Sequence, residues 1–128
     1  MSAEANKALI RQLIEEVINQ GNLALIDDLF DAAFVDRSAP DQPPGLAGVR
    51  EYIAAARAGF PDLHASIEDL IAEGDKVVVR TTWRGMHQGM YEGVAPTGKQ
   101  VTRTMIQIFR VTNGKLAEEW NEGPGLLL

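Results

Sequence analysis

The 128 residues of the chain, 14.0 kDa in mass, are enough for one domain over residues 1–128 with one hydrophobic core. A formal net charge of -6 and a pI near 4.8 argue against binding to phosphate backbones, so we expect no nucleic acid partner. The chain has no cysteine, which excludes disulfides, thiolate nucleophiles and zinc–thiolate sites. Residues 1–30 contain no uninterrupted apolar run, so we expect no signal peptide, no membrane contact and a cytoplasmic location.

The first half of the chain is predicted to be mainly helical, because apolar residues recur there at helical spacing. Gly21 can end the first helix in the left-handed conformation, and Asn22 can cap the second. Three prolines and a glycine within residues 38–45 predict a loop before the third helix. The predicted helices are residues 5–20, 23–30 and 46–58, with an extended segment at residues 33–36.

From residue 63 onward the spacing of apolar residues becomes alternating, which predicts an antiparallel sheet. Residues 73–76 form a turn, and a two-residue loop there places Asp69 opposite Arg80. A glycine-rich connection follows at residues 85–98, and it contains His87 and Tyr91. The predicted strands are residues 63–71, 77–84, 101–111 and 115–122.

The last two strands are predicted to form a tight hairpin. Asn113 and Gly114 favour a type I′ turn, because both readily adopt the positive φ that this turn requires. A two-residue loop fixes which residues face each other across the hairpin. The predicted pairs are Gln107–Trp120, Phe109–Glu118 and Val111–Leu116. One face of the hairpin then combines an amide, a carboxylate, an indole and apolar walls, a mixture typical of a small-molecule pocket.

Three helices followed by a curled antiparallel sheet define an α+β arrangement with the helices on one face. Several short motifs occur in a fixed order, namely FPDLH at 60–64, GDKV at 74–77, GMHQG at 85–89, PTG at 96–98, FRV at 109–111, NGK at 113–115 and EEW at 118–120. This ordered set resembles the SnoaL-like polyketide cyclase family, part of the wider NTF2-like, ketosteroid-isomerase-like group. The resemblance implies a conical barrel with three N-terminal helices packed in a curved antiparallel sheet.

The resemblance also implies roles for individual residues. Asp36 corresponds to the carboxylate base of the isomerases, and Gln107 to an acid that donates a proton or a hydrogen bond to the reacting carbonyl. Ile14 occupies the position of a tyrosine in the isomerases, and Arg37 that of a histidine in many related cyclases. An amide donates a hydrogen bond but cannot transfer a proton, so Gln107 changes the character of the expected acid.

Two further catalytic candidates come from the predicted strands and connections. Glu118 is expected to face apolar neighbours, where burial would raise its pKa and make it an acid. His87 is a candidate too, although a histidine in a glycine-rich connection is more often exposed or structural. Asp36 could instead cap a turn, and Gln107 could simply bond to the indole of Trp120. The residues expected to bind substrate or form the pocket wall are Ile14, Arg37, Tyr52, Phe60, Trp83, Tyr91, Met105, Phe109 and Trp120.

Several functions are compatible with these residues. The first is a cofactor-independent enzyme of aldol cyclase or isomerase type, which transfers a proton next to a carbonyl of a polyketide-like or aromatic ketone. Alternatives are a non-catalytic small-molecule binding protein, a hydroxylase-type or hydrolase-type enzyme of the same fold, and a protein whose main role is association. His64 and His87 are the only histidines and lack ligand spacing, so we expect no metal and no cofactor. The expected partners are a small apolar or aromatic molecule and a second copy of the chain in a homodimer.

Overall fold

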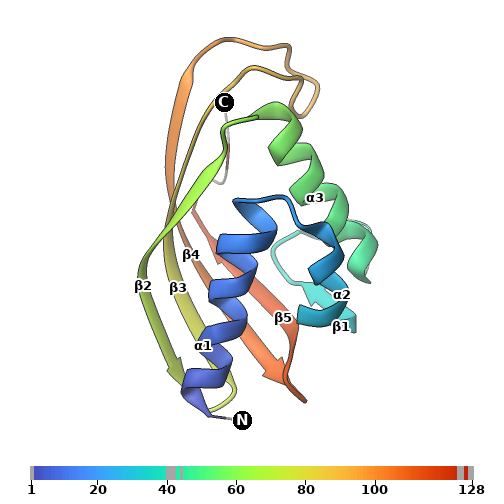
Figure 1. Cartoon of the computed structure of the whole chain (residues 1–128), viewed down its shortest axis with the longest axis vertical. Coiled ribbons are helices and arrows are strands. Elements are labelled where there is room, and N and C mark those ends of the chain that lie inside the picture. The colour runs from blue at the N-terminus through green and yellow to red at the C-terminus, as the bar shows by residue number, and fades with distance from the viewer. Residues whose placement is uncertain (1, 40–42, 44, 124–125, 127–128) are drawn as a thin grey trace.

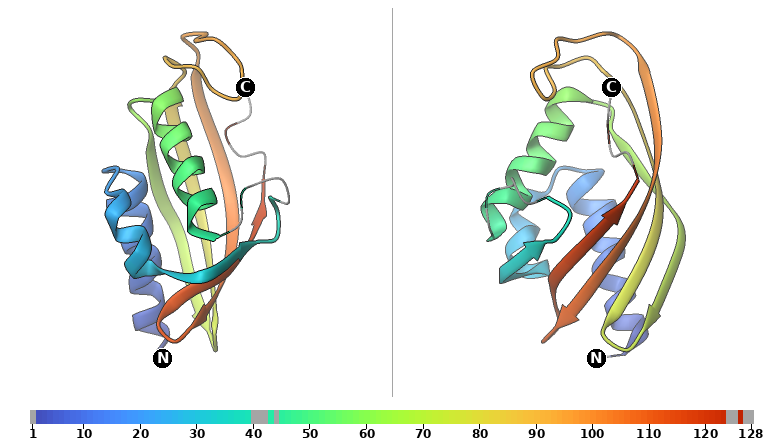
Figure 2. Two further views of the ribbon diagram at one scale, coloured as in Figure 1. Left: turned by 90° about the vertical axis from the view of Figure 1, so that its right-hand side faces the viewer. Right: turned by 180° about the vertical axis from the view of Figure 1, so that it is seen from behind.

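The helices lie on the concave side of a strongly curved sheet (Figure 1, Figure 2). The structure, a computed structural model, describes residues 2–39, 43, 45–123 and 126. The helical elements are α1 (Ala3–Gln12), the π-helical turn η1 (Leu13–Ile18) that continues it, the 3₁₀ turn η2 (Leu23–Leu25), α2 (Ile26–Leu29) and α3 (Gly45–Gly59). The strands are β1 (Phe30–Asp36), β2 (His64–Glu73), β3 (Lys76–Met86), β4 (Gln100–Thr112) and β5 (Lys115–Glu122). The predicted α+β fold of three helices and a curved sheet is confirmed.

The ends of the predicted helices differ slightly from those observed. Gly21 has a φ of 75°, as expected for a residue that ends a helix in the left-handed conformation. Phe30 is already the first residue of β1, so the second helical segment ends one residue earlier than predicted. The predicted capping role of Asn22 is wrong, because its ψ of 76° lies outside the extended conformation of a capping residue and its side chain makes no capping bond. Of the predicted loop, residues 40–42 and 44 lie outside the described residues.

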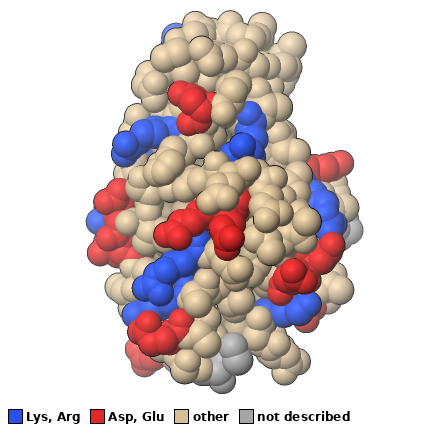
Figure 3. All heavy atoms as spheres, viewed as in Figure 1, with Lys and Arg blue, Asp and Glu red and all other residues tan. Residues whose placement is uncertain are grey.

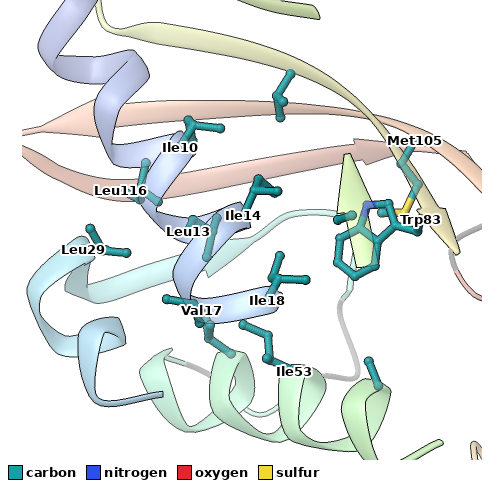
Figure 4. Packing of buried hydrophobic residues seen from close by; sticks show 14 of the residues in the cluster. Ile10, Leu13, Ile14, Val17, Ile18, Leu29, Ile53, Trp83, Met105 and Leu116 are labelled. Carbon is teal, nitrogen blue, oxygen red and sulfur yellow. The ribbon is translucent and has the colours of Figure 1, made fainter. Parts of the chain in front are cut away.

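The N-terminal helix provides a large part of the hydrophobic core. It packs against β2 and β3, and Figure 4 shows its apolar side chains in one cluster with Ile53 of α3 and with Trp83 and Met105 of the sheet. Full burial of an aliphatic side chain of this size contributes about 1.5–3 kcal/mol, so this face fixes the helix on the sheet. The buried apolar residues of α1 and η1 are Ile10, Leu13, Ile14, Val17 and Ile18.

The last part of this helix is wound as a π-helix. The N–H of Asn19 donates to the carbonyl oxygen of Ile14 at 3.0 Å, which is the i→i+5 pattern. Arg57 of α3 donates to the carbonyl oxygens of Ile18 at 2.7 Å and Asn19 at 3.0 Å, and so satisfies two acceptors that the helix end leaves open. The widened turn directs Leu13 and Ile18, five residues apart, to the same cavity.

The five strands form an open mixed sheet in the order β1-β5-β4-β3-β2. The three pairs formed by β2 to β5 are antiparallel, as predicted, whereas β1 pairs with β5 in parallel. The expectation of a wholly antiparallel sheet is therefore wrong at this edge. β1 and β5 are separated by most of the chain, so no hairpin turn dictates that they run in opposite directions. The parallel pairing brings the end of β1 next to the middle of β5.

The predicted register of the β2–β3 hairpin is confirmed. Asp69 lies opposite Arg80, and Arg80 Nε donates to Asp69 Oδ2 at 2.6 Å. Both side chains are about half exposed, so this ion pair contributes no more than about 1 kcal/mol to the free energy of unfolding. A β-bulge between Ile67 and Asp69 shifts the pairing further along these strands and increases the local bend.

The predicted register of the β4–β5 hairpin is correct only next to the turn. Asn113 and Gly114 have φ of 51° and 74°, as a type I′ turn requires, and the predicted Val111–Leu116 pair is present. Beyond that pair Ala117 has no partner in the register and forms a β-bulge, which shifts the pairing of the following residues of β5 by one position. The predicted Gln107–Trp120 and Phe109–Glu118 pairs are consequently wrong. The observed pairs are Gln107–Asn121, Ile108–Trp120, Phe109–Glu119 and Arg110–Glu118.

Charged side chains of both signs lie next to each other on the face shown in Figure 3, without a large patch of one sign among the described residues there. Lys76, for example, lies 3.2 Å from its neighbour Asp75, and Lys7 lies 3.6 Å from Glu4. Mixed charges of this kind differ from the clusters of Lys and Arg that bind phosphate backbones. Within the described ranges, no helix is long and apolar enough to cross a membrane.

Candidate active site

A cavity of about 280 Å³ lies between the helices and the concave face of the sheet. Most of its wall is apolar, and the polar side chains come from β1, the residues after it, α3, β4 and β5. None of the described lining residues is a lysine, arginine or histidine. The described lining residues are Leu13, Ile18, Phe30, Phe34, Asp36, Ser38, Ala39, Val49, Tyr52, Ile53, Trp83, Met105, Gln107, Phe109, Glu119, Asn121 and Gly123.

Six of the predicted site residues line this cavity, and seven do not. The two lining residues with a predicted catalytic role are Asp36 and Gln107, at the end of β1 and in the middle of β4. The other four lining residues are Tyr52, Trp83, Met105 and Phe109. The residues outside the described lining are Ile14, Arg37, Phe60, His87, Tyr91, Glu118 and Trp120.

Two carboxyl groups face the cavity from neighbouring strands. Asp36 of β1 lies directly opposite Glu119 of β5 in the parallel pair. Gln107 Nε2 donates to Glu119 Oε2 at 2.8 Å. Asn121 Nδ2 donates to Asp36 Oδ2 at 3.4 Å, and the backbone N–H of Ser38 donates to Asp36 Oδ1 at 2.9 Å. The site is thus a short row of two carboxyl groups, each held by an amide.

The two carboxyl groups differ in their affinity for protons. Burial and the charge of Asp36 raise the pKa of Glu119 to about 7, despite the hydrogen bonds from Gln107 and Asn121 that lower it. Burial also raises the pKa of Asp36, and the hydrogen bond from the Ser38 backbone works in the opposite direction. Of the two carboxyl groups, Glu119 is therefore the one that retains a proton in a large fraction of the molecules near neutral pH.

Glu118 does not face the cavity, because the bulge at Ala117 turns its side chain to the outer face of the sheet. It accepts hydrogen bonds from Arg110 Nε at 2.7 Å and from Arg37 Nε at 2.6 Å. These bonds, first from Arg110 and then from Arg37, lower the pKa of Glu118. The prediction that burial raises the pKa of this residue is therefore wrong. Arg37 is occupied by the same ion pair, outside the cavity.

His87 is completely buried, so of the two expected states, exposed or structural, the structural one is observed. Its Nδ1 accepts a hydrogen bond from the backbone N–H of Thr97 at 3.2 Å, and its ring lies 5.5 Å from that of Phe60. The Phe60 ring also packs against Tyr91 at a centroid distance of 5.2 Å. The connection after β3 folds back onto the end of α3, where the Gly59 carbonyl accepts two backbone N–H groups. This aromatic cluster lies behind the cavity wall and supports the end of α3.

Tyr52 of α3 places a hydroxyl group at the cavity. Burial raises its pKa above the usual range of a tyrosine, with smaller contributions from Tyr91 and the nearby acids. Burial likewise raises the pKa of Tyr91 to about 12, although a side-chain hydrogen bond with Tyr52 lowers it. Tyr52 therefore stays neutral and can donate or accept a hydrogen bond. Ile14 is buried in the core, and Trp120 lies on the outer face opposite Ile108.

Glu119 and Asn121 are the functional candidates that the sequence did not predict. The adjacent carboxylates Glu118 and Glu119 were a visible signal, since one of two neighbours on a strand must face inward. Only the bulge decides which of them does. Two carboxyl groups and the Tyr52 hydroxyl are the described ionisable groups that line the cavity. No group of three His, Asp or Glu among the described residues could hold a metal ion.

A curved sheet that wraps helices around an apolar cavity with a few convergent polar groups has the NTF2-like fold. Comparison with protein families agrees with this class. The profile of the SnoaL-like polyketide cyclase family matches residues 8–123, and the chain belongs to this family. No curated protein matches the sequence closely enough to count as a relative.

Solved structures with the same fold include three proteins from Streptomyces species. TsrD from Streptomyces laurentii superposes with a TM-score of 0.88 at 25% identity, over 96% of this chain and 90% of TsrD. AclR from Streptomyces galilaeus, a proposed hydroxylase, gives a TM-score of 0.84 at 28% identity, over 96% and 77% of the two chains. IdmH from Streptomyces antibioticus, a proposed polyketide cyclase, gives 0.78 at 31% identity, over 92% and 91%.

Proposed function

We propose that the protein is a cofactor-independent enzyme that transfers a proton next to the carbonyl group of a neutral polyketide-like or aromatic ketone. The reaction is of aldol cyclase or isomerase type. The observation that carries the proposal is the pair of unequal carboxyl groups, Asp36 and Glu119, at one apolar cavity. A site that holds one carboxylate as base beside hydrogen-bond donors can remove a carbon-bound proton and stabilise the oxygen that becomes negative. Membership of the polyketide cyclase family supports the same chemistry.

Asp36 is the proposed base. Its carboxylate opens onto the cavity, and the Ser38 N–H and Asn121 amide fix its orientation. When Asp36 takes the proton, the C–H bond breaks and an O–H bond forms. The electron pair left behind forms the C=C bond of an enolate, whose oxygen carries the charge. Partial burial strengthens Asp36 as a base, because it raises the pKa of the carboxyl group.

The lining of the cavity limits the kind of substrate. Aromatic walls from Phe30, Phe34, Trp83 and Phe109 favour a planar apolar molecule. Because no described lining residue is a lysine, arginine or histidine, an anionic substrate would find no partner for its charge beside two acids. The volume of about 280 Å³ is close to the lower end of the range for ligand pockets, so we propose a small bicyclic or similarly sized ketone.

We predict that the protein accelerates exchange of the α-hydrogens of 2-tetralone for deuterium. This aromatic ketone is neutral and has acidic hydrogens next to its carbonyl group. The exchange is followed by proton NMR in D₂O, with buffer alone as the reference. 2-Naphthol, which resembles the enol, should bind and inhibit. A rate equal to that of buffer would contradict the proposed enzyme.

A binding protein without catalysis is the second candidate. The amide of Gln107 cannot transfer a proton, and the buried Ile14 offers no hydroxyl group to a carbonyl. Binding of 2-naphthol, measured by calorimetry, together with a failure to exchange 2-tetralone would favour this candidate. The same two measurements therefore separate the two functions.

We also propose that the outer face of the sheet forms a homodimer. An apolar row, Ile71, Val78, Ile108 and Trp120, crosses four adjacent strands in register, and Ile71 is 61% exposed. Ile106 adds a further apolar side chain that is 44% exposed. Apolar surface of this extent is stabilised when a partner covers it. We predict a dimer in sedimentation velocity at micromolar concentration and a monomer for Ile106→Glu. A monomeric wild-type protein would contradict the dimer.

A further inference from the structure

We infer that Glu119 is the proton donor of the site, and that Gln107 and Asn121 are positioning residues that hold its carboxyl group at the cavity. The inference rests on the proposed function, because a donor is needed only if an enolate forms. It assigns the acid to a strand position that the sequence pattern did not reveal.

The position of Glu119 follows from two features of the sheet. The bulge at Ala117 turns Glu119 inward, and the parallel pairing with β1 places it directly opposite Asp36. Side chains of opposed residues lie on the same face, and neighbouring strands are only about 4.8 Å apart. Base and acid can therefore act on two atoms of one substrate, the α-carbon and the carbonyl oxygen, which are both bonded to the carbonyl carbon.

Amide groups hold the carboxyl group of Glu119 in place. Gln107 Nε2 donates to Glu119 Oε2 at 2.8 Å, and this bond fixes which end of the amide faces the acid. Within the described residues, Gln107 Oε1 and Asn121 Oδ1 are buried without a hydrogen-bond partner. A carboxylate can only accept hydrogen bonds, whereas a carboxylic acid has an O–H that it can offer to a ligand. Gln107 therefore holds the carboxyl group of Glu119 through an N–H and does not compete for its proton.

The electrostatic surroundings also favour a proton on Glu119. Burial and the charge of Asp36 raise its pKa to about 7. The other ionisable side chain at this end of the cavity is Tyr52 of α3, which stays neutral because burial raises its pKa. Asp36, the opposed carboxyl group, is the proposed base, so the pair contains one base and one acid.

The proton transfer that follows is balanced. Asp36 takes the α-proton, and the electron pair of the broken C–H bond moves into the new C=C bond while the carbonyl π electrons move to oxygen. Glu119 then gives its O–H proton to that oxygen and becomes a carboxylate. The resulting enol returns this proton to Glu119 when the carbonyl forms again. The carbon regains a proton from Asp36, and in D₂O this is a deuteron once the Asp36 carboxyl group has exchanged with solvent.

The test is the variant Glu119→Gln, assayed for deuterium exchange of 2-tetralone across a range of pH. Glutamine keeps the size and can donate a hydrogen bond, but it cannot transfer a proton. We expect the exchange rate to fall about 100-fold. We also expect the decline of the wild-type rate above about pH 7 to disappear, because it reports ionisation of Glu119. The matched control is Glu118→Gln, which removes the neighbouring carboxylate outside the cavity and should leave rate and pH profile unchanged.

The outcomes separate this inference from the proposed function. If the wild-type protein catalyses exchange and Glu119→Gln retains both rate and pH profile, the inference alone is overturned. If the wild-type protein catalyses no exchange, both fail.

Urea denaturation provides a readout that does not depend on activity. A raised folded pKa favours the folded state at low pH and loses this contribution as pH rises through about 7. Glu119→Gln should therefore be more stable than wild type at about pH 8.5 but not at about pH 5, and equal stability at both would overturn the protonated acid.

Discussion

Replacing Asp36 by asparagine is expected to lower the exchange rate of 2-tetralone by about 1,000-fold, since general base catalysis typically contributes about 10²–10⁴-fold. Asparagine has the same shape and one oxygen that can still accept the N–H of Ser38, but its NH2 group cannot accept from Asn121 Nδ2 and it cannot accept a proton from carbon. Binding of 2-naphthol, measured by calorimetry, should change only a few-fold, because the apolar walls are untouched. A large loss of rate with preserved binding is the expected signature of a base.

The same variant offers an internal check on the neighbouring acid. The charge of Asp36 contributes to the raised pKa of Glu119, so Asp36→Asn should lower that pKa. Carboxyl ¹³C NMR of the variant would show this shift without any turnover. Asp31→Asn is a suitable control, because Asp31 belongs to the same strand but does not line the cavity. Unchanged exchange in Asp36→Asn would remove Asp36 from the mechanism.

The second large effect is expected on stability, from Trp83→Ala. Trp83 is buried, lines the cavity and donates from Nε1 to Thr81 Oγ1 at 2.8 Å. Removing the indole enlarges the cavity and leaves the buried Thr81 hydroxyl without this donor. Substitutions of this kind typically lower the free energy of unfolding by about 3–5 kcal/mol. Urea denaturation of the purified variant measures the loss.

Trp120→Ala provides the matched control for this prediction. It is the other tryptophan of the chain, and it lies on the outer face of the sheet, partly exposed. We expect it to cost about 1 kcal/mol, well below the cost at Trp83. Equal losses at the two positions would contradict the assignment of Trp83 to the buried face of the sheet and of Trp120 to its outer face. A loss at Trp120 that depends on protein concentration would instead report the proposed dimer.

The sequence was sufficient to predict the elements of the fold because its periodicity is clear. The apolar face of residues 5–20 and the alternation after residue 63 correspond directly to buried positions in the structure. The Asn113-Gly114 turn was predictable too, since few residues adopt two successive positive φ angles. These features are local, and each is determined by neighbours within a few residues.

The site was less predictable, because its geometry depends on contacts that local patterns do not contain. Nothing in residues 115–122 marks Ala117 as the extra residue of a bulge, yet the bulge decides that Glu119 faces the cavity. The burial of His87 has a similar origin. Gly89 approaches the Ala58 carbonyl so closely that a Cβ atom would lie 2.0 Å from its oxygen, and this contact folds the connection onto α3.

The extra residue in β5 also affects how relatives of this protein can be compared. Side chains alternate between the two faces of a strand, so the same strand without the bulge, with Ala117 paired in the ladder, would present Glu118 and Trp120 to a ligand, and Glu119 and Asn121 to solvent. Two proteins with the same Glu-Glu-Trp-Asn segment can therefore have unlike binding sites. The geometry of this strand must therefore be known before the role of a residue is transferred from one family member to another by sequence alignment.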